Sequence, residues 1–387
     1  MVSRMVYLRY ASTSGGTSLT DGKKSVTPPD FDPRAWAREQ EGPIDAEALA
    51  GLRLLAKSNA KLRETKGLLR LSETRVEELE QVVATFEALT EQAQQPIHIA
   101  KPKRKKSGKK RHLFVALLSD THSSEVVDPI ECPLSGAGHN AEIGEARMRE
   151  YFRSVSMLYR EQAKTFDIPV LVLALLGDFQ VNSLLHPDSA TDLAPMEEVQ
   201  FIYRILREGI ESLLDSTDCK IVIPTVFGNH GRITPKQWYS GAASVSSEHL
   251  IYEMLAASIR DKRVTWDIRP QIIKTLEVEG WKFLVTHGDR TSGMGNYSGG
   301  VGGLSIPLKK ALGRWHAAEA GGIHACAIGH FHTPTLVTGK PFGAANGSLV
   351  GPTPYSQGLE NYRPTQWCWL VDLERLEVGR ILPVWVD

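Results

Sequence analysis

The sequence predicts an α/β fold built around a sheet that is covered on both faces. From residue 113 onward, short apolar runs such as Leu113–Leu118 and Val170–Leu176 alternate with stretches of helical periodicity. The apolar runs are continuous and do not alternate with polar residues, which is typical of strands buried on both sides. Strands that alternate with helices indicate an α/β architecture.

The remaining elements follow in order along the chain. Predicted helices span Ala141–Phe166, Met196–Leu214, Ser247–Arg260 and Pro307–Glu319. Further strands are predicted at Lys220–Val226, Trp281–Val285, Ala325–Ile328, Trp367–Val371 and Ile381–Val386. The second helix shows the pattern most clearly, because its apolar residues recur at helical spacing. Together these elements form one predicted catalytic domain over residues 113–387.

Composition narrows the class of protein. The chain has 387 residues, of which 42% are hydrophobic and 23% charged, as in ordinary soluble globular proteins. The formal net charge is zero, so the protein as a whole has no positive field that would favour the binding of nucleic acid. No apolar run approaches the roughly 20 residues of a membrane span, and the first residues lack a signal-peptide core. We therefore expect a soluble, cytoplasmic protein with no membrane partner and with reduced cysteines.

The N-terminal third differs from the rest of the chain in its residue composition. Residues 1–43 are rich in Ser, Thr, Gly and Pro and are predicted to form an irregular arm. Residues 44–96 are predicted to be helical, because no proline occurs between 45 and 94 and helix-favouring residues dominate. A seven-residue apolar repeat within them favours a coiled coil, and hence a homo-oligomer formed through residues 45–94. The second row of positions in this repeat is partly polar. This leaves open the alternative of amphipathic helices that pack on the catalytic domain. The repeat consists of Leu55, Leu62, Leu69, Val76 and Val83.

A basic linker is predicted over residues 97–112. Eight of the eleven residues from Lys101 to Arg111 are cationic, and Pro, Ser and Gly interrupt them. Such a segment can hold nucleic-acid phosphates by releasing counterions. The alternative is a solvated spacer, and either interpretation makes it a domain boundary.

Five apolar strands each lead into a loop with metal-ligand residue types. Ligands bind beyond the carboxyl ends of strands in open α/β sheets, so these side chains should meet in one crevice. Each of these short motifs is common by itself. Five of them, each directly after a predicted strand, indicate a metal site. The motifs are Asp120-Thr121-His122, Gly177-Asp178, Gly228-Asn229-His230, His287-Gly288 and Gly329-His330-Phe331-His332.

Oxygen and imidazole ligands without thiolate suit Mn²⁺, Fe or Zn²⁺. The ligands suffice for two cations, which a central carboxylate can bridge at about 3.5–4 Å. Such a pair lowers the pKa of a water and neutralises a phosphate. The pattern therefore predicts in-line hydrolysis of a phosphoester.

The ordered motifs resemble the signature of the calcineurin-like metallophosphoesterases, over residues 113 to about 350. The resemblance implies a four-layer α/β/β/α sandwich and two divalent cations, with Mn²⁺ preferred over Fe, Zn²⁺, Mg²⁺ or Ni²⁺. It implies that His230 contacts the phosphate and protonates the leaving oxygen. One metal would be held by Asp120, His122, Asp178 and His332. The other would be held by Asp178, Asn229, His287 and His330.

This chain departs from the family pattern directly after His230. The family has Asp or Glu there, whereas Gly231-Arg232 follows in this sequence. A carboxylate would orient the ring and raise the pKa of the histidine, so its absence weakens the assignment of His230 as an acid. Arg232 is interpreted either as a bidentate phosphate clamp or as a surface residue. Asn140 and Arg290 are predicted as further substrate contacts.

The layout of helical segment, basic linker and Ser-Asp-x-His motif resembles phage- and prophage-encoded metallophosphoesterases of the DNA-repair exonuclease type. This wider resemblance implies a nuclease or phosphodiesterase that acts on DNA in a bacterial or phage-infected cell. Two alternatives remain. One is a phosphodiesterase or phosphatase for small nucleotides or phosphoproteins, with a pocket walled by residues 292–303. The other is a coiled-coil scaffold with a degenerate catalytic fold, which the complete ligand set disfavours.

Overall fold

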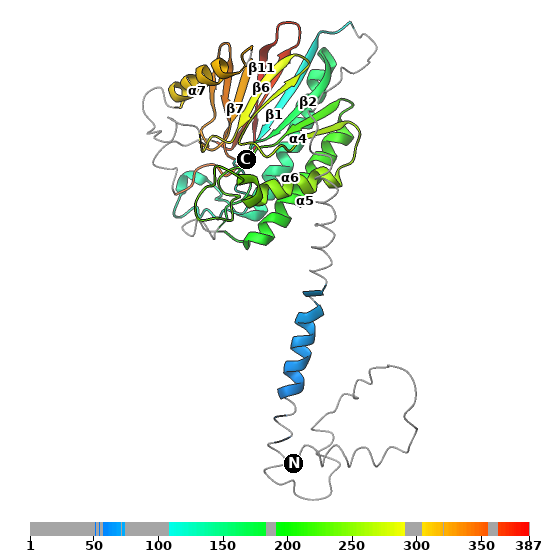
Figure 1. Ribbon diagram of the computed structural model, residues 1–387, viewed down its shortest axis with the longest axis vertical. Helices are drawn as coiled ribbons and strands as arrows, with labels where there is room; N and C mark the ends of the chain where they lie inside the picture. The colour runs from blue at the N-terminus through cyan, green and yellow to red at the C-terminus, as the bar shows by residue number, and fades with distance from the viewer. Residues whose placement is uncertain are drawn as a thin grey trace, which may run out of the picture. The chain divides into compact units, whose positions relative to one another are not determined.

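A computed structural model describes residues 51, 54, 57–70, 72–73, 108–182, 191–290, 304–319, 321–354 and 363–386. The chain divides into two compact units, Met1–Leu79 and Glu80–Asp387 (Figure 1). In the first unit residues 57–70 are helical, as predicted for this part of the chain. The predictions for the arm at 1–43, most of the segment at 44–96, the basic run at 101–107 and the loop at 292–303 lie outside the described residues.

The second unit contains a six-stranded sheet in the order β11-β10-β1-β2-β3-β4. Strands β1 to β4 run parallel, because a helix connects each to the next, and β10 and β11 are antiparallel. The strands are β1 (Arg111–Leu118), β2 (Asp167–Leu175), β3 (Lys220–Pro224), β4 (Val264–Asp267), β10 (Thr365–Asp372) and β11 (Glu377–Trp385). The connecting helices are α4 (Ala141–Thr165), α5 (Pro195–Ser216) and α6 (Ser247–Ser258), with short 3-10 turns at Pro133–Ser135 and Ala242–Val245.

A second, five-stranded sheet has the order β5-β6-β7-β9-β8. Strands β6, β7 and β9 are parallel, and helix α7 (Ser305–Ala318) connects β6 to β7. The strands are β5 (Ile273–Val278), β6 (Trp281–Thr286), β7 (Ala325–Ile328), β8 (Thr335–Val337) and β9 (Phe342–Ala345).

Three hydrophobic cores separate four layers. Phe114 of β1 faces α4, α5 and α6, while its neighbour Val115 faces the second sheet. Phe283 of β6 joins Val115 in the core between the sheets, whereas Leu284 packs on Leu308 of α7. Alternate residues of one strand therefore enter different cores, and helices cover both outer faces (Figure 1). The expected α/β/β/α sandwich is confirmed.

Four short strands were not predicted from the sequence, namely β4, β5, β8 and β9. Three of them lie at sheet edges, where a strand needs fewer apolar residues. The fourth, β9, contains Gly343, at which an added Cβ would lie 2.4 Å from Leu312 of α7. Close packing of α7 thus explains a strand with low intrinsic propensity. Among the described residues no helix is long and apolar enough to cross a membrane.

Candidate metal centre

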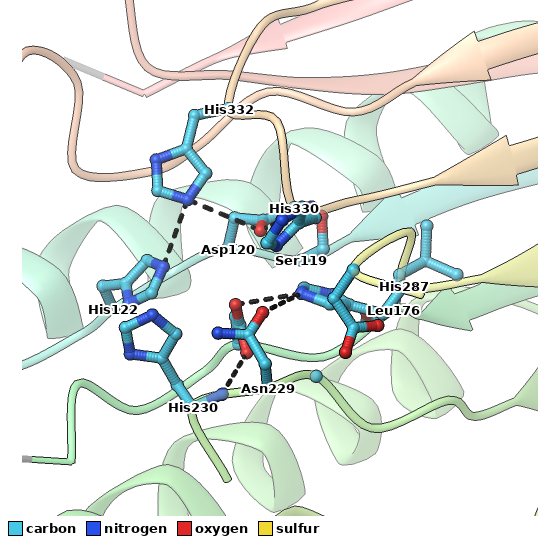
Figure 2. A network of polar contacts seen from close by, with 12 residues as sticks. Ser119, Asp120, His122, Leu176, Asn229, His230, His287, His330 and His332 are labelled. Atoms are coloured by element: carbon cyan, nitrogen blue, oxygen red, sulfur yellow. Dashed lines mark hydrogen bonds and ion pairs between the residues drawn. The ribbon is translucent and has the colours of Figure 1, made fainter. Parts of the chain in front are cut away.

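The seven predicted ligands and His230 meet at the carboxyl ends of the strands (Figure 2). The parallel strands β1, β2 and β3 place the first three motifs at one edge of their sheet. Strands β6 and β7 bring the other two motifs to the same place from the second sheet. The site therefore lies where the two sheets meet.

One group combines Asp120, His122 and His332. Their ligand atoms all lie within 4.8 Å of one another. The Nε2 atoms of His122 and His332 are 3.2 Å apart, and Nε2 of His332 is 3.5 Å from Oδ1 of Asp120. Two imidazole nitrogens and a carboxylate converging on one point form a donor set suited to a divalent cation.

A second group combines Asp178, His287 and His330 within the same distance limit. Nε2 of His287 lies 2.9 Å from Oδ2 of Asp178 and 3.3 Å from Oδ1 of Asn229. The other ring nitrogen, Nδ1, is 2.7 Å from the carbonyl of Leu176, which therefore accepts its proton and leaves Nε2 to face the site.

Asp178 also belongs to a third group, with His122 and His230. It is thus the carboxylate common to both sides of the centre. The donor set of oxygens, imidazoles and one amide fits divalent cations, and Asp178 would be the ligand available to both sides of the centre.

Most of the ligands have strained backbone. Positive φ angles occur at 51° for Asp120, 37° for His122, 55° for Asp178, 71° for His330 and 55° for His332. Non-glycine residues rarely adopt this left-handed region, and each instance costs on the order of 1–3 kcal/mol. Such strain clusters at functional sites, so these angles mark the centre independently of residue type.

Burial sets the charge of most of the histidines. Desolvation, together with neighbouring histidines, holds the pKa of His122 well below its usual value and lowers that of His330 to about 4. The pKa of His332 is lowered for the same reason, although 31% of its side chain is exposed. Neutral imidazole is the form that binds metal, so these three rings are ready to act as ligands.

His287 behaves differently. Burial lowers the pKa of His287, but the carboxylate of Asp178 outweighs this effect and raises it well above its usual value. Burial raises the pKa of Asp178, but the same pairing outweighs it and holds the value well below the usual range. In the metal-free protein the two therefore form a buried ion pair. A cation at this position would replace the proton on His287.

His230 is oriented by a main-chain carbonyl. Its Nδ1 lies 2.8 Å from the carbonyl oxygen of Val181, and since a carbonyl only accepts, Nδ1 carries a proton. Nε2 is then the nitrogen available to the site. Gly231 supplies no side chain, and a Cβ there would lie 2.7 Å from Cγ of Glu248. The space next to His230 is therefore occupied by another buried carboxylate.

The three predicted substrate contacts have different surroundings. Nη1 of the half-buried Arg232 donates a short hydrogen bond to the carbonyl of Asn229, which places Arg232 beside the site. Arg290 donates to the carbonyl of Trp238 at 2.5 Å. Oδ1 of Asn140 accepts from Ile143 N at 2.9 Å and caps α4. A role in substrate binding stays a prediction for all three.

Sequence reasoning missed two buried glutamates, Glu198 and Glu248, which hold the loops of the centre. Both lie in the first turn of a helix, where acidic residues are common because they favour the helix dipole. Nothing in their spacing distinguishes them from ordinary solvent-facing residues. Only their depth in the structure does.

No model of a known protein family matches the sequence, and no curated protein matches it. Among solved structures, a predicted phosphoesterase from Streptococcus pneumoniae TIGR4 is 14% identical with a TM-score of 0.28, covering 70% of this chain and 97% of its own. A hypothetical protein from Pyrococcus horikoshii OT3 is 11% identical with a TM-score of 0.34, covering 71% and 89%. Vps29 from Chaetomium thermophilum is 8% identical with a TM-score of 0.28, covering 71% and 100%. Similarity at this level says nothing about substrate, so the chemistry rests on the site.

Proposed function

We propose that this protein is a phosphoester hydrolase that uses two divalent metal ions, with Mn²⁺ as the first candidate. The observation that carries the proposal is that two ligand groups share Asp178, one with His122 and His230 and the other with His287 and His330. When bound, two such cations neutralise the charge of a phosphate and lower the pKa of the attacking water. One would be held by Asp120, His122, Asp178 and His332, and the other by Asp178, Asn229, His287 and His330.

The chain's own residues bind the phosphate and move a proton. In this proposal His230 presents Nε2 to the leaving oxygen while the carbonyl of Val181 holds Nδ1. To donate, the ring carries protons on both nitrogens, and the carbonyl stabilises that form because it accepts from Nδ1 throughout. Arg232, held on the carbonyl of Asn229, is placed to bind a phosphate oxygen.

The side chains of Trp238, Tyr239 and Arg290, here called the rim, support a substrate that carries nucleobases. Trp238 and Tyr239 are 46% and 81% exposed, and the guanidinium of Arg290 lies 5.6 Å from the Tyr239 ring centre. This loop is tied to the segment after His287, because Gln237 donates to Asp289 at 2.9 Å. Exposed aromatic rings beside a cation are typical of sites where bases stack, at about 1–3 kcal/mol each. We therefore propose DNA as the substrate class.

Hydrolysis assays with Mn²⁺ test this proposal. Single-stranded DNA, duplex DNA, a nucleoside 3′,5′-cyclic phosphate and bis(p-nitrophenyl) phosphate are compared for the wild type and for His332→Ala. DNA cleavage that His332→Ala abolishes is the expected result. Turnover of the small diesters alone would overturn the DNA assignment. A metal-loaded protein that is inert on all four and on the monoester p-nitrophenyl phosphate would overturn the hydrolase.

Replacing Trp238 with alanine separates the rim from the centre. Because stacking contributes to binding the base and not to the chemistry, Trp238→Ala should lower DNA cleavage about tenfold or more. The turnover of bis(p-nitrophenyl) phosphate should stay unchanged. An equal loss on both substrates would show that the loop supports the fold and does not bind bases.

We also propose that the chain self-associates through residues 45–94. In the described part of that segment, Leu62 and Leu69 are 53% and 58% exposed and fall on the seven-residue repeat. Sedimentation of the full chain against the double variant Leu62→Asp and Leu69→Asp tests this. A monomeric wild type would contradict it.

A further inference from the structure

Glu248 joins two loops that carry candidate ligands. It lies in the first turn of α6 and is fully buried. Its Oε1 accepts a hydrogen bond from Phe179 N and its Oε2 accepts one from Gly228 N, both at 2.7 Å. Phe179 directly follows Asp178, and Gly228 directly precedes Asn229. One carboxylate therefore fixes the spacing between a carboxylate ligand and an amide ligand.

Glu198 holds the next part of the same loop. It lies in the first turn of α5 and is 1% exposed. Its Oε1 accepts from Val181 N at 2.9 Å and from the Ser124 hydroxyl through a short hydrogen bond, and its Oε2 accepts from Asn182 N at 3.0 Å. Charge-assisted bonds of this kind are about twice as strong as neutral ones.

The segment that Glu198 holds is the one that orients His230. The carbonyl of Val181 accepts from Nδ1 of His230, and the side-chain Nδ2 of Asn182 donates to the main-chain carbonyl of His230 at 2.7 Å. Asn182 adopts this position with a φ of 60°, in the strained left-handed region. The ring and the main-chain carbonyl of His230 thus depend on Val181 and Asn182. Glu198 binds the main-chain amides of both of these residues.

We propose that Glu198 and Glu248 are positioning residues with separate tasks. Glu248 sets the geometry of the metal ligands Asp178 and Asn229. Glu198 sets the orientation of His230, in place of the carboxylate that this sequence lacks at Gly231. The assignment of the second task to catalysis rests on the proposed phosphoester hydrolysis, whereas the first concerns metal binding alone.

Two isosteric variants in the full chain separate the tasks. In Glu248→Gln an amide NH₂ faces a main-chain N–H, so one hydrogen bond is lost and the loops separate. Supporting residues of this kind affect metal affinity by about 10–100-fold, so Mn²⁺ binding measured by calorimetry should weaken by that factor. Glu198→Gln should bind Mn²⁺ as the wild type does. Its kcat should fall about 10–100-fold with KM unchanged, and the pH profile of kcat should shift.

A matched control and a readout independent of activity complete the test. Glu211→Gln removes an exposed glutamate of α5 that pairs only with Arg207 among the described contacts, and it should change nothing. ¹⁵N spectra of histidine-labelled protein, assigned with His230→Gln, should show the Nδ1–H tautomer of His230 in the wild type and a mixture in Glu198→Gln.

The outcomes discriminate between the two proposals. If both variants lose metal affinity and kcat equally, or lose only thermal stability, the division of tasks is wrong and the glutamates are structural. If the wild type hydrolyses no phosphoester, the proposed function fails. The calorimetry and the ¹⁵N spectra then still decide the two positioning roles.

Discussion

The two aspartates of the centre, Asp120 and Asp178, are held by the same backbone arrangement in different loops. Oδ1 of Asp178 accepts from His230 N at 2.8 Å, and Oδ1 of Asp120 accepts from His330 N at 2.8 Å. Each carboxylate also lies against a glycine, Gly228 for Asp178 and Gly329 for Asp120. The glycines lack the Cβ that would block this approach.

Their charge states nevertheless differ. Burial raises the pKa of both carboxyl groups, but His287 outweighs it for Asp178, whose pKa is held well below the usual range. The pKa of Asp120 is raised to about 7, because burial outweighs the lowering by His287 and the nearby Asp178 adds to the rise. His332, the ring 3.5 Å from Asp120, stays neutral because its own pKa is lowered.

The supporting groups also differ. Two buried glutamates bind the loop of Asp178. Asp120 itself is held by two serine hydroxyls, since Ser119 donates to its carboxylate and Ser348 to its main-chain carbonyl. The same backbone arrangement thus holds one carboxylate that is paired with His287 and one whose pKa burial raises.

The largest expected effect follows from the ion pair. In chelator-treated protein, Asp178→Asn leaves His287 buried without its anion, which should lower the free energy of unfolding by about 3 kcal/mol. Asp120→Asn should cost clearly less, because burial raises the pKa of Asp120 to about 7 in spite of the charge of His287. Urea denaturation of both variants with excess EDTA measures the difference. Equal losses would mean that the two aspartates have the same charge surroundings.

A smaller effect is expected from the glycines. A Cβ at Gly228 would lie 2.0 Å from Oδ1 of Asp178 and 2.7 Å from its main-chain nitrogen, whereas one at Gly329 would lie 2.6 Å from Oδ2 of Asp120. Both alanine variants should lose about 1–3 kcal/mol of unfolding free energy, with Gly228→Ala the more destabilised. Gly313→Ala is the control, because a Cβ there meets nothing within 4 Å. The reverse ranking would contradict the cradle geometry.

Measured per pH unit, the smallest change is expected from the titration of Asp120. With its pKa at about 7, Asp120 keeps a proton in the folded, metal-free protein that the unfolded chain has released above its ordinary value of 3.8. Its contribution is therefore fully present below that value and falls as pH rises toward 7, by up to about 1.4 kcal/mol per pH unit. Unfolding free energies of wild type minus Asp120→Asn, measured with EDTA across this range, should show that slope. A flat difference would show that Asp120 is ionised without metal.

The sequence predicted the α/β class from local signals and the four layers from the family resemblance, and it supplied the residue types of the candidate centre. Continuous apolar runs such as Leu113–Leu118 are local signals, and so are glycines next to Asp178 or His330 at strand ends. Because parallel strands end at one edge, knowing the strands places the ligand loops together without knowing their contacts. The helices were predicted because their periodicity is also a local signal. The short edge strands β4 and β8 were not predicted.

The tertiary structure alone decided how the ligands are held and charged. Glu248 bonds to Phe179 across 69 residues, and His230 finds its carbonyl partner 49 residues away, separations that no periodicity encodes. Whether a buried carboxyl such as Asp120 or Asp178 is ionised depends on the rings packed beside it, which only the folded chain brings there. The residue types of the centre were local information, while their supports and charges come from long-range contacts.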